Sequence, residues 1–423
     1  ATWLTSGLQV SRRCRWHRGY RVPSPHTLVG HSSSPKIAQH ASARKPCMLR
    51  IILEQREDGV VEGVYSVPPS RRYWVVRADA GAYFNHFGFH GLVAVGHLDG
   101  IALPISEDIL ASALDWADVY RQFMHKADAD GGSIRQASSK YRQASRFATE
   151  IQLGDWVLTV TSNAVRVGVV TGDAYLSRKA VELTGLSEEP IPMPFLLRRS
   201  VEWGPTIQKD QLSSPLLRAL RANQTIFNAD ALWDDICHAL FPVFSRNEDF
   251  YFTVKITTNQ KIRGIDVSNL LGFFSDLEII GRASVALNEY PERFDEIFDV
   301  LEASDRLTLT TEAEYHSPGE IWGLISSGIG QGFGVGGIFV LAYSMLFGNS
   351  KLGFDGVIDI ETRRKLWDLV IERMKYRRVA KAVDRLDAQA PARDVERLIS
   401  HDSKPSSSDA SDVNGNRPPS DEG

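Results

Sequence analysis

The feature that most constrains this chain is a run of thirty residues without a charged side chain, from Ile321 to Ser350. About twenty such residues in a helix span the hydrocarbon core of a bilayer. The preceding segment, Ser317-Pro318-Gly319-Glu320, has the pattern of a helix N-terminus. We therefore predict a hydrophobic helix over residues 318–348 that crosses or inserts into a membrane.

The glycines of this run recur every four residues, so that they share one face of a helix. Such a face lets a second helix approach closely, which favours packing within a membrane or a homo-oligomer. The predicted helix-packing residues are Gly328, Gly332 and Gly336. A buried helical hairpin in the protein's own core is the alternative. A dinucleotide-binding loop at Gly332–Gly337 is disfavoured, because it requires a strand where the sequence predicts the start of a helix and further strand–helix units beyond Asp355 that the sequence does not show.

A charged helix is predicted over residues 361–400. Its basic residues suit the cytoplasmic surface of an inner or plasma membrane with anionic lipids. They are Arg363, Arg364, Lys365, Arg373, Lys375, Arg377 and Arg378.

Both ends of the chain are polar. Residues 1–47 hold no acidic residue and form a predicted disordered basic leader, with an organellar transit peptide or a nucleic-acid-binding arm as alternatives. Residues 401–423 form a predicted disordered tail. The three cysteines are too widely separated for a disulfide framework or a zinc cluster, so no metal or cofactor is predicted, and a reducing compartment such as the cytoplasm is expected.

The remaining chain predicts an α+β fold. Buried strands are expected at Tyr73–Ala78 and Gly91–Leu98, a helix from Ser106, and a hairpin formed by Trp156–Thr161 and Val165–Gly172. Residues 248–316 then follow the order strand, helix, helix, strand, which predicts a small α+β domain.

Residues 71–231 carry four segments in fixed order: RRYWVVRADAG, GLVAVGHLD, GDWVLTVTSNAVRVGVVTGDAY and RRSVEWGPTIQKDQLSSPLLRALRANQTIF. This series resembles the EVE-like domain of the PUA superfamily, found at the N-terminus of prokaryotic restriction and defence proteins such as Mrr-type endonucleases. The resemblance implies a small β-barrel with a pocket for a modified base or a nucleotide-like ligand. It also implies a Trp where this chain has His97, and imidazole stacks more weakly than indole.

A base pocket requires a π-surface for stacking, polar groups for the base edge, and room for close backbone approach. The residues predicted to supply these are Trp74, Arg77, His97, Trp156, Gly168, Gly172 and Tyr175. Each has a structural alternative, because a Trp on a strand often lies in the core.

No catalytic residue is predicted. LGFDGVIDIETRRK offers Asp355, Asp359, Glu361 and Lys365, which are the residue types of a metal-dependent nuclease, but the acid-x-Lys strand that should follow is missing. The sequence therefore predicts a non-enzymatic sensor that couples nucleic-acid or nucleotide recognition to a membrane helix, in prokaryotic antiviral defence. A modification-dependent restriction endonuclease and an interaction scaffold with an inactive EVE-like fold are the alternatives.

Overall fold

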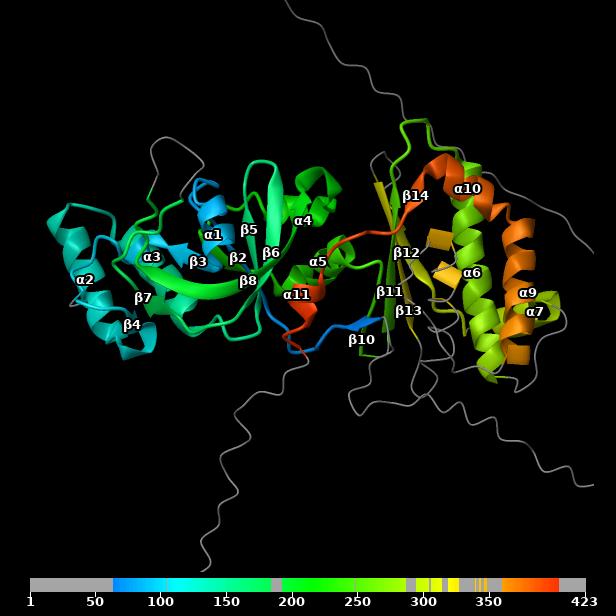
Figure 1. The fold of residues 1–423 in the computed structure, drawn as a ribbon, viewed down its shortest axis with the longest axis horizontal. Helices are drawn as coiled ribbons and strands as arrows, with labels where there is room; N and C mark the ends of the chain where they lie inside the picture. The colour runs from blue at the N-terminus through cyan, green and yellow to red at the C-terminus, as the bar shows by residue number, and fades with distance from the viewer. Residues whose placement is uncertain are drawn as a thin grey trace, which may run out of the picture. The chain divides into compact units, whose positions relative to one another are not determined.

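A computed structural model describes residues 64–103, 105–183, 192–247, 249–286, 294–303, 306–313, 319–326, 339, 342–343, 346–347 and 360–402. The leader at 1–47 and the tail from residue 403 lie outside these residues. His401 and Asp402, predicted as the start of the tail, are described: His401 contacts Glu202 at 2.6 Å, and Asp402 accepts from the Tyr65 hydroxyl at 2.7 Å. The α+β class is confirmed (Figure 1).

The first sheet has eight strands and curls into half a barrel. The strand order is β4-β7-β8-β6-β5-β2-β9, with β3 paired to β8; only β2 and β5 among these pairs are parallel. The predicted strand at Tyr73 and the predicted hairpin are confirmed as β2 and β5–β6. The strands are β2 Tyr73–Val76, β3 Leu92–Val95, β4 Ile109–Leu110, β5 Trp156–Val160, β6 Ala164–Val170, β7 Tyr175–Leu176, β8 Leu197–Gln208 and β9 Ile226–Asn228.

Five helices accompany this sheet: α1 Phe84–His90, α2 Trp116–Ala129, α3 Ile134–Thr149, α4 Ser214–Ala219 and α5 Trp233–Leu240. The helix expected from Ser106 begins ten residues later, because Asp115 accepts the backbone N–H groups of Ala117 and Asp118 as its N-cap. Arg199 of β8 donates to the carbonyls of Phe147 and Ala148, which lie in the last turn of α3. This guanidinium fixes α3 against the sheet.

The second sheet has the order β1-β10-β11-β13-β12, with β14 paired to β11. The predicted order of strand, helix, helix and strand is present as β11, α6, α7 and β12, but the sheet is larger than predicted. Its strands are β1 Tyr65–Ser66, β10 Val243–Arg246, β11 Asp249–Ile256, β12 Thr310–Ala313, β13 Gly319–Ser326 and β14 Ala388–Gln389. Its helices are α6 Gly264–Ala286, α7 Phe294–Ala303, α9 Ile360–Tyr376 and α10 Val379–Leu386, and α6 packs against α9 and α10 (Figure 1). The last helix, α11 Glu396–Ile399, packs against β8 of the first sheet.

The predicted start of the hydrophobic helix is wrong. Residues 319–326 form β13, which lies between β11 and β12 and pairs with both. Glu320, taken as part of a capping box, accepts the indole N–H of Trp322 at 2.9 Å and contacts Lys255 of β11 at 3.1 Å. Pairing with two strands outweighs a local capping pattern, because it satisfies the backbone along the whole segment.

The described residues from the rest of this run lie in the protein's own core. Phe339 packs against Phe252 of β11 with ring centroids 4.4 Å apart, and the Tyr343 hydroxyl donates to the carbonyl of Thr253. Gly328, Gly332 and Gly336 lie outside the described residues. Among the residues that the structure does describe, no helix has the length and apolarity needed to cross a membrane. The contacts of Phe339 and Tyr343 favour the alternative of a helix packed in the core.

The single charged helix predicted over residues 361–400 is also wrong. The chain breaks after α9, where Arg378 has a φ of 53°, and again after α10, where Asp387 has a φ of 45°. Two of the predicted membrane-surface residues, Arg373 and Arg377, instead bind the buried Asp276 of α6. Lys375 and Arg378 are exposed, whereas the side chains of Arg363, Arg364 and Lys365 lie outside the described residues.

Candidate functional site

Two of the predicted stacking residues, Trp74 and Trp156, lie in the core. Both are fully buried. The Trp74 indole donates to Asp155 at 2.9 Å, and Trp156 packs against Tyr65 with ring centroids 6.0 Å apart. Their burial favours the structural alternative, in which both rings belong to the core.

Three further predicted residues lie in strand contacts rather than in a cavity. A Cβ on Gly168 would lie 2.5 Å from a methyl group of Val201, and one on Gly172 would lie 3.1 Å from the Cβ of Ser200. These glycines allow strands to approach each other closely. Tyr175 is half-buried on β7, beside β8, and burial raises the pKa of its hydroxyl.

The packing role of Gly168 gives a first prediction. Gly168→Ala should lower the free energy of unfolding by about 2 kcal/mol, because the added methyl group would overlap Val201, Trp203 and the carbonyl of Glu202. Gly132→Ala is the control, since its Cβ would lie at an ordinary 3.5 Å from the nearest atom. Urea unfolding measures both variants, and equal stability for the two would contradict the packing role.

The other two predicted residues, Arg77 and His97, line one cavity of about 400 Å³. This volume lies within the range of small-molecule pockets. The cavity lies near the end of β2 and the turn after β3. Its remaining walls come from Asp79, Ala80, Gly96, Phe195, Asn223 and Thr225.

A left-handed turn at the end of β2 places Asp79 at this cavity. Asp79, Ala80 and Gly81 have φ values of 49°, 53° and 99°, and the Gly81 N–H donates to the carbonyl of Ala78 at 3.0 Å. Positive φ at both central residues is a left-handed turn, which costs about 1 kcal/mol at an alanine. Strain of this kind is often found at binding sites.

Phe195 provides an aromatic wall. Its ring packs edge-on against Tyr83, with centroids 4.9 Å apart, and a Cβ on Gly96 would lie only 2.6 Å from it. Gly96 therefore makes room for this ring. Asp99 lies in the turn after β3 and accepts the backbone N–H of Leu196, the residue after Phe195, at 3.0 Å.

Gln143 of α3 contacts both His97 and the start of β9. The Gln143 side-chain carbonyl accepts the backbone N–H groups of Thr225 at 2.9 Å and Ile226 at 3.2 Å. A hydrogen bond between Gln143 and the His97 ring favours the protonated imidazole. Nε2 of His97 is buried and has no partner among the described residues.

Burial and the nearby charge of Lys140 lower the pKa of His97, while the bond with Gln143 raises it. The ring is consequently neutral at neutral pH, and its buried Nε2 has no partner among the described residues. Arg77 offers a second such atom: its guanidinium is bonded to the carbonyl of Leu220, but its Nε is buried with no partner among the described residues. A buried donor without a partner is costly, which a bound acceptor would correct.

Six cavity residues were missed by sequence reasoning, and four of them have a polar or aromatic side chain: Asp79, Phe195, Asn223 and Thr225. Asp79 had a signal, because it directly follows the predicted strand YWVVRA, and strand ends often carry functional residues. The other three have no local signal, since they reach the cavity only through the folding of distant segments. Within the described part of the chain, no three His, Cys, Asp or Glu residues are grouped as metal ligands.

Comparison with protein-family models, curated proteins and solved structures gives no match for this chain. The resemblance to EVE-like domains therefore stays a prediction. The proposal for its function therefore rests on the cavity and not on similarity to a known protein.

Proposed function

We propose that this protein binds a nucleobase, a modified base or a nucleotide-like ligand in the cavity beside Arg77 and His97, in a PUA-like domain. The observation that carries the proposal is that Arg77 and His97, each with a buried nitrogen that has no partner among the described residues, line one cavity together with the aromatic ring of Phe195. Base edges carry both the acceptors that an Arg Nε–H requires and the donors or acceptors that an imidazole nitrogen pairs with.

The remaining walls fit the same ligand class. Phe195 offers an aromatic surface, which supports a base by stacking. Asp79 accepts hydrogen bonds from exocyclic amino groups, and Asn223 and Thr225 offer both donors and acceptors. These groups can hold and orient a base through hydrogen bonds and stacking, which is the binding role proposed.

The membrane, antiviral and oligomer parts of the sequence-based prediction depend mainly on residues 327–350. Most of these residues lie outside the described part of the chain, and the membrane role stays a prediction. The same holds for the nuclease alternative, because Asp355 and Asp359 lie outside the described residues and Glu361 and Lys365 fall on α9.

Titration calorimetry of the full chain tests the cavity against 5-methylcytidine, N6-methyladenosine and their unmodified nucleosides. Asp79→Asn should lower the affinity for the bound nucleoside by roughly tenfold, because it removes a charged acceptor while Asn still tolerates the left-handed turn. Tyr175→Phe is the control: it was predicted at the site, but the structure places it on β7 away from the cavity walls.

Two results would contradict the proposal. Binding that is lost in Tyr175→Phe but kept in Asp79→Asn would place the site elsewhere. Absence of binding to every nucleoside, and to single-stranded oligonucleotides that carry the same bases, would favour the scaffold alternative.

A further inference from the structure

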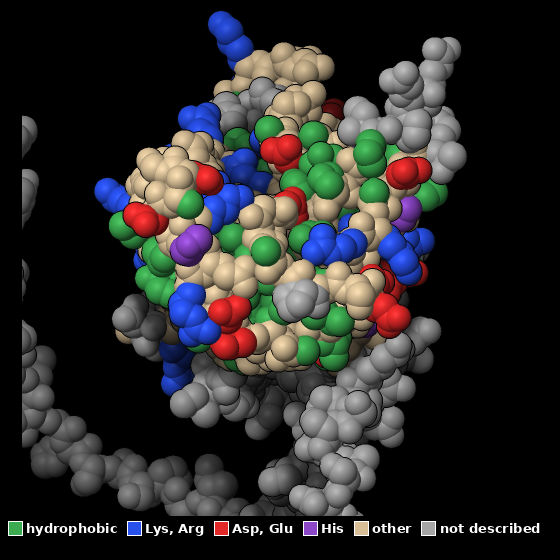
Figure 2. All heavy atoms as spheres, turned by 90° about the vertical axis from the view of Figure 1, so that its left-hand side faces the viewer, with side chains coloured by type: hydrophobic (Ala, Val, Ile, Leu, Met, Phe, Trp, Pro, Cys, Tyr) green, Lys and Arg blue, Asp and Glu red, His purple; other side chains and the backbone are tan. Residues whose placement is uncertain are grey.

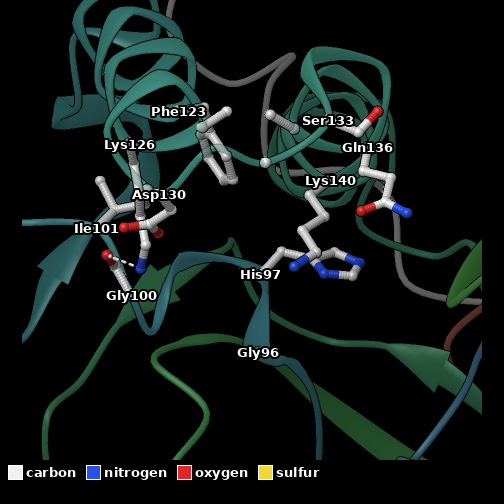
Figure 3. A pocket seen from close by; sticks show the side chains of 13 residues that line it. Gly96, His97, Gly100, Ile101, Phe123, Lys126, Asp130, Ser133, Gln136 and Lys140 are labelled. Atoms are coloured by element: carbon white, nitrogen blue, oxygen red, sulfur yellow. Dashed lines mark hydrogen bonds between the residues drawn. The ribbon is translucent and has the colours of Figure 1, made fainter.

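A second cavity of about 240 Å³ lies between α2, α3 and the turn that follows β3. Figure 3 shows Phe123 pointing into it from α2, with the side chains of Lys126 and Lys140 around it. Its floor is apolar, at Ile101 and Phe123, and most of its rim is polar.

This second cavity shares Gly96 and His97 with the cavity assigned to the base. The His97 ring therefore stands between the two, and Figure 3 shows it beneath α3, close to Lys140. One ligand can reach both cavities if it extends past the imidazole. A nucleoside that places its base in the first cavity would direct its sugar and 5′ or 3′ substituent toward the second.

The rim of the second cavity is mainly cationic. Lys126 donates to the carbonyl of Gly100 at 2.8 Å, which uses one of its three N–H donors. Lys140 is exposed, and no ion pair between described residues involves it. Asp130 is the single carboxylate among the residues lining this cavity.

The helix that carries Lys140 adds to this positive charge. Residues 134–149 of α3 include Arg135, Lys140, Arg142 and Arg146 and contain no acidic residue. Figure 2 shows this side of the molecule, where Lys and Arg side chains lie interspersed with Asp and Glu side chains. The cavity lining holds Lys126 and Lys140 against Asp130, and this net positive charge attracts an anion.

From these observations we infer that the second cavity is a phosphate subsite, and that Lys126 and Lys140 bind a phosphate attached to the nucleoside in the first cavity. The inference rests on the proposed function and narrows its ligand to a phosphorylated one. A mononucleotide and an internal residue of a polynucleotide share this chemistry.

The test compares each nucleoside with its 5′-monophosphate and its 3′-monophosphate, by calorimetry on the full chain. One of the monophosphates should bind about tenfold more tightly than the nucleoside, and Lys140→Gln should remove that gain while leaving the nucleoside affinity within twofold. Arg142→Gln is the matched control, since it removes the same charge from an exposed position of α3 that does not line the cavity.

The outcomes separate the subsite from the first cavity. Nucleoside binding without any gain from either phosphate overturns the subsite alone, whereas absence of all binding overturns both proposals. Equal losses in Lys140→Gln and Arg142→Gln also overturn the subsite, because they indicate general charge attraction.

A single-stranded oligonucleotide with the same base at an internal position identifies the source of the phosphate. A Lys140→Gln loss with both the mononucleotide and the oligonucleotide supports the subsite for either source. A loss with the oligonucleotide alone supports a backbone phosphate, and the slope of log K against log salt should then flatten by about 0.7 in Lys140→Gln.

Discussion

As pH rises from 4 to 6, the free energy of unfolding of His238→Phe is expected to fall by about 2 kcal/mol relative to that of the wild type. Over the same range, the free energy of unfolding of Asp235→Asn is expected to rise by about 1 kcal/mol relative to that of the wild type. Both residues lie on α5. Burial lowers the pKa of His238 to about 3. Burial also raises the pKa of Asp235 to about 6, against the hydrogen bond from Ser213 and with the help of nearby acidic residues.

The two groups contribute with opposite signs. His238 stabilises the folded state fully above its unfolded pKa of about 6.5, and this stability is lost as pH falls from there toward 3. Asp235 stabilises it fully below its unfolded pKa of about 3.8, and this stability is lost as pH rises toward 6. Their effects oppose each other between pH 4 and 6, so only the single variants reveal them.

The substitutions keep the packing. His238 stacks on Trp322 with centroids 4.4 Å apart and planes 6° apart, and a Phe ring retains this contact. The hydrogen bond between His238 and Thr253 is lost, which shifts stability equally at every pH. Urea unfolding between pH 4 and 7 measures the slopes, and parallel curves for all three proteins would show that neither group titrates differently on folding.

Asp276→Ala should lower the free energy of unfolding by about 3 kcal/mol, because it leaves two guanidinium groups without their shared buried carboxylate. Asp276 accepts from Arg373 Nε at 2.9 Å and from Arg377 Nε and Nη2 at 3.0 Å each. These bonds join α6 to α9. Gly272 lies one turn earlier on α6, and a Cβ there would lie 2.7 Å from Arg377, so the glycine makes room for this side chain.

Lys375→Ala is the control for this prediction, since Lys375 is exposed on the same helix and forms no ion pair with another residue that the structure describes. It should change stability by less than about 0.5 kcal/mol. Thermal or urea unfolding compares the variants. Similar losses in Lys375→Ala and Asp276→Ala would contradict the role of the buried ion pair.

Local patterns in the sequence determined the α+β class and several of its elements. YWVV and the segments on either side of Ser162-Asn163-Ala164 are apolar runs bounded by turn residues, and they form β2, β5 and β6. The order of strand, helix, helix and strand from residue 248 also follows from periodicity alone. These signals suffice because strands, turns and amphipathic helices depend on neighbouring residues.

Two of the seven predicted site residues, Arg77 and His97, also lie on the cavity. Both stand at strand ends, where the chain leaves the core. Trp74 and Trp156 have the right chemistry for stacking a base, but a strand has two faces, and the sequence does not tell which face another layer covers.

Only the tertiary structure determined that residues 319–326 form a strand. Their local pattern indicates a helix start, but the backbone of this segment pairs with β11 and β12. Ile321 and Ile325 are buried, and Lys255 of β11 provides the opposite charge for Glu320. In the same way Phe195, Asn223 and Thr225 become neighbours of His97 only when distant segments meet. Pairing between distant segments determines where these residues lie, because it stabilises the fold by more than a single helix cap or turn does.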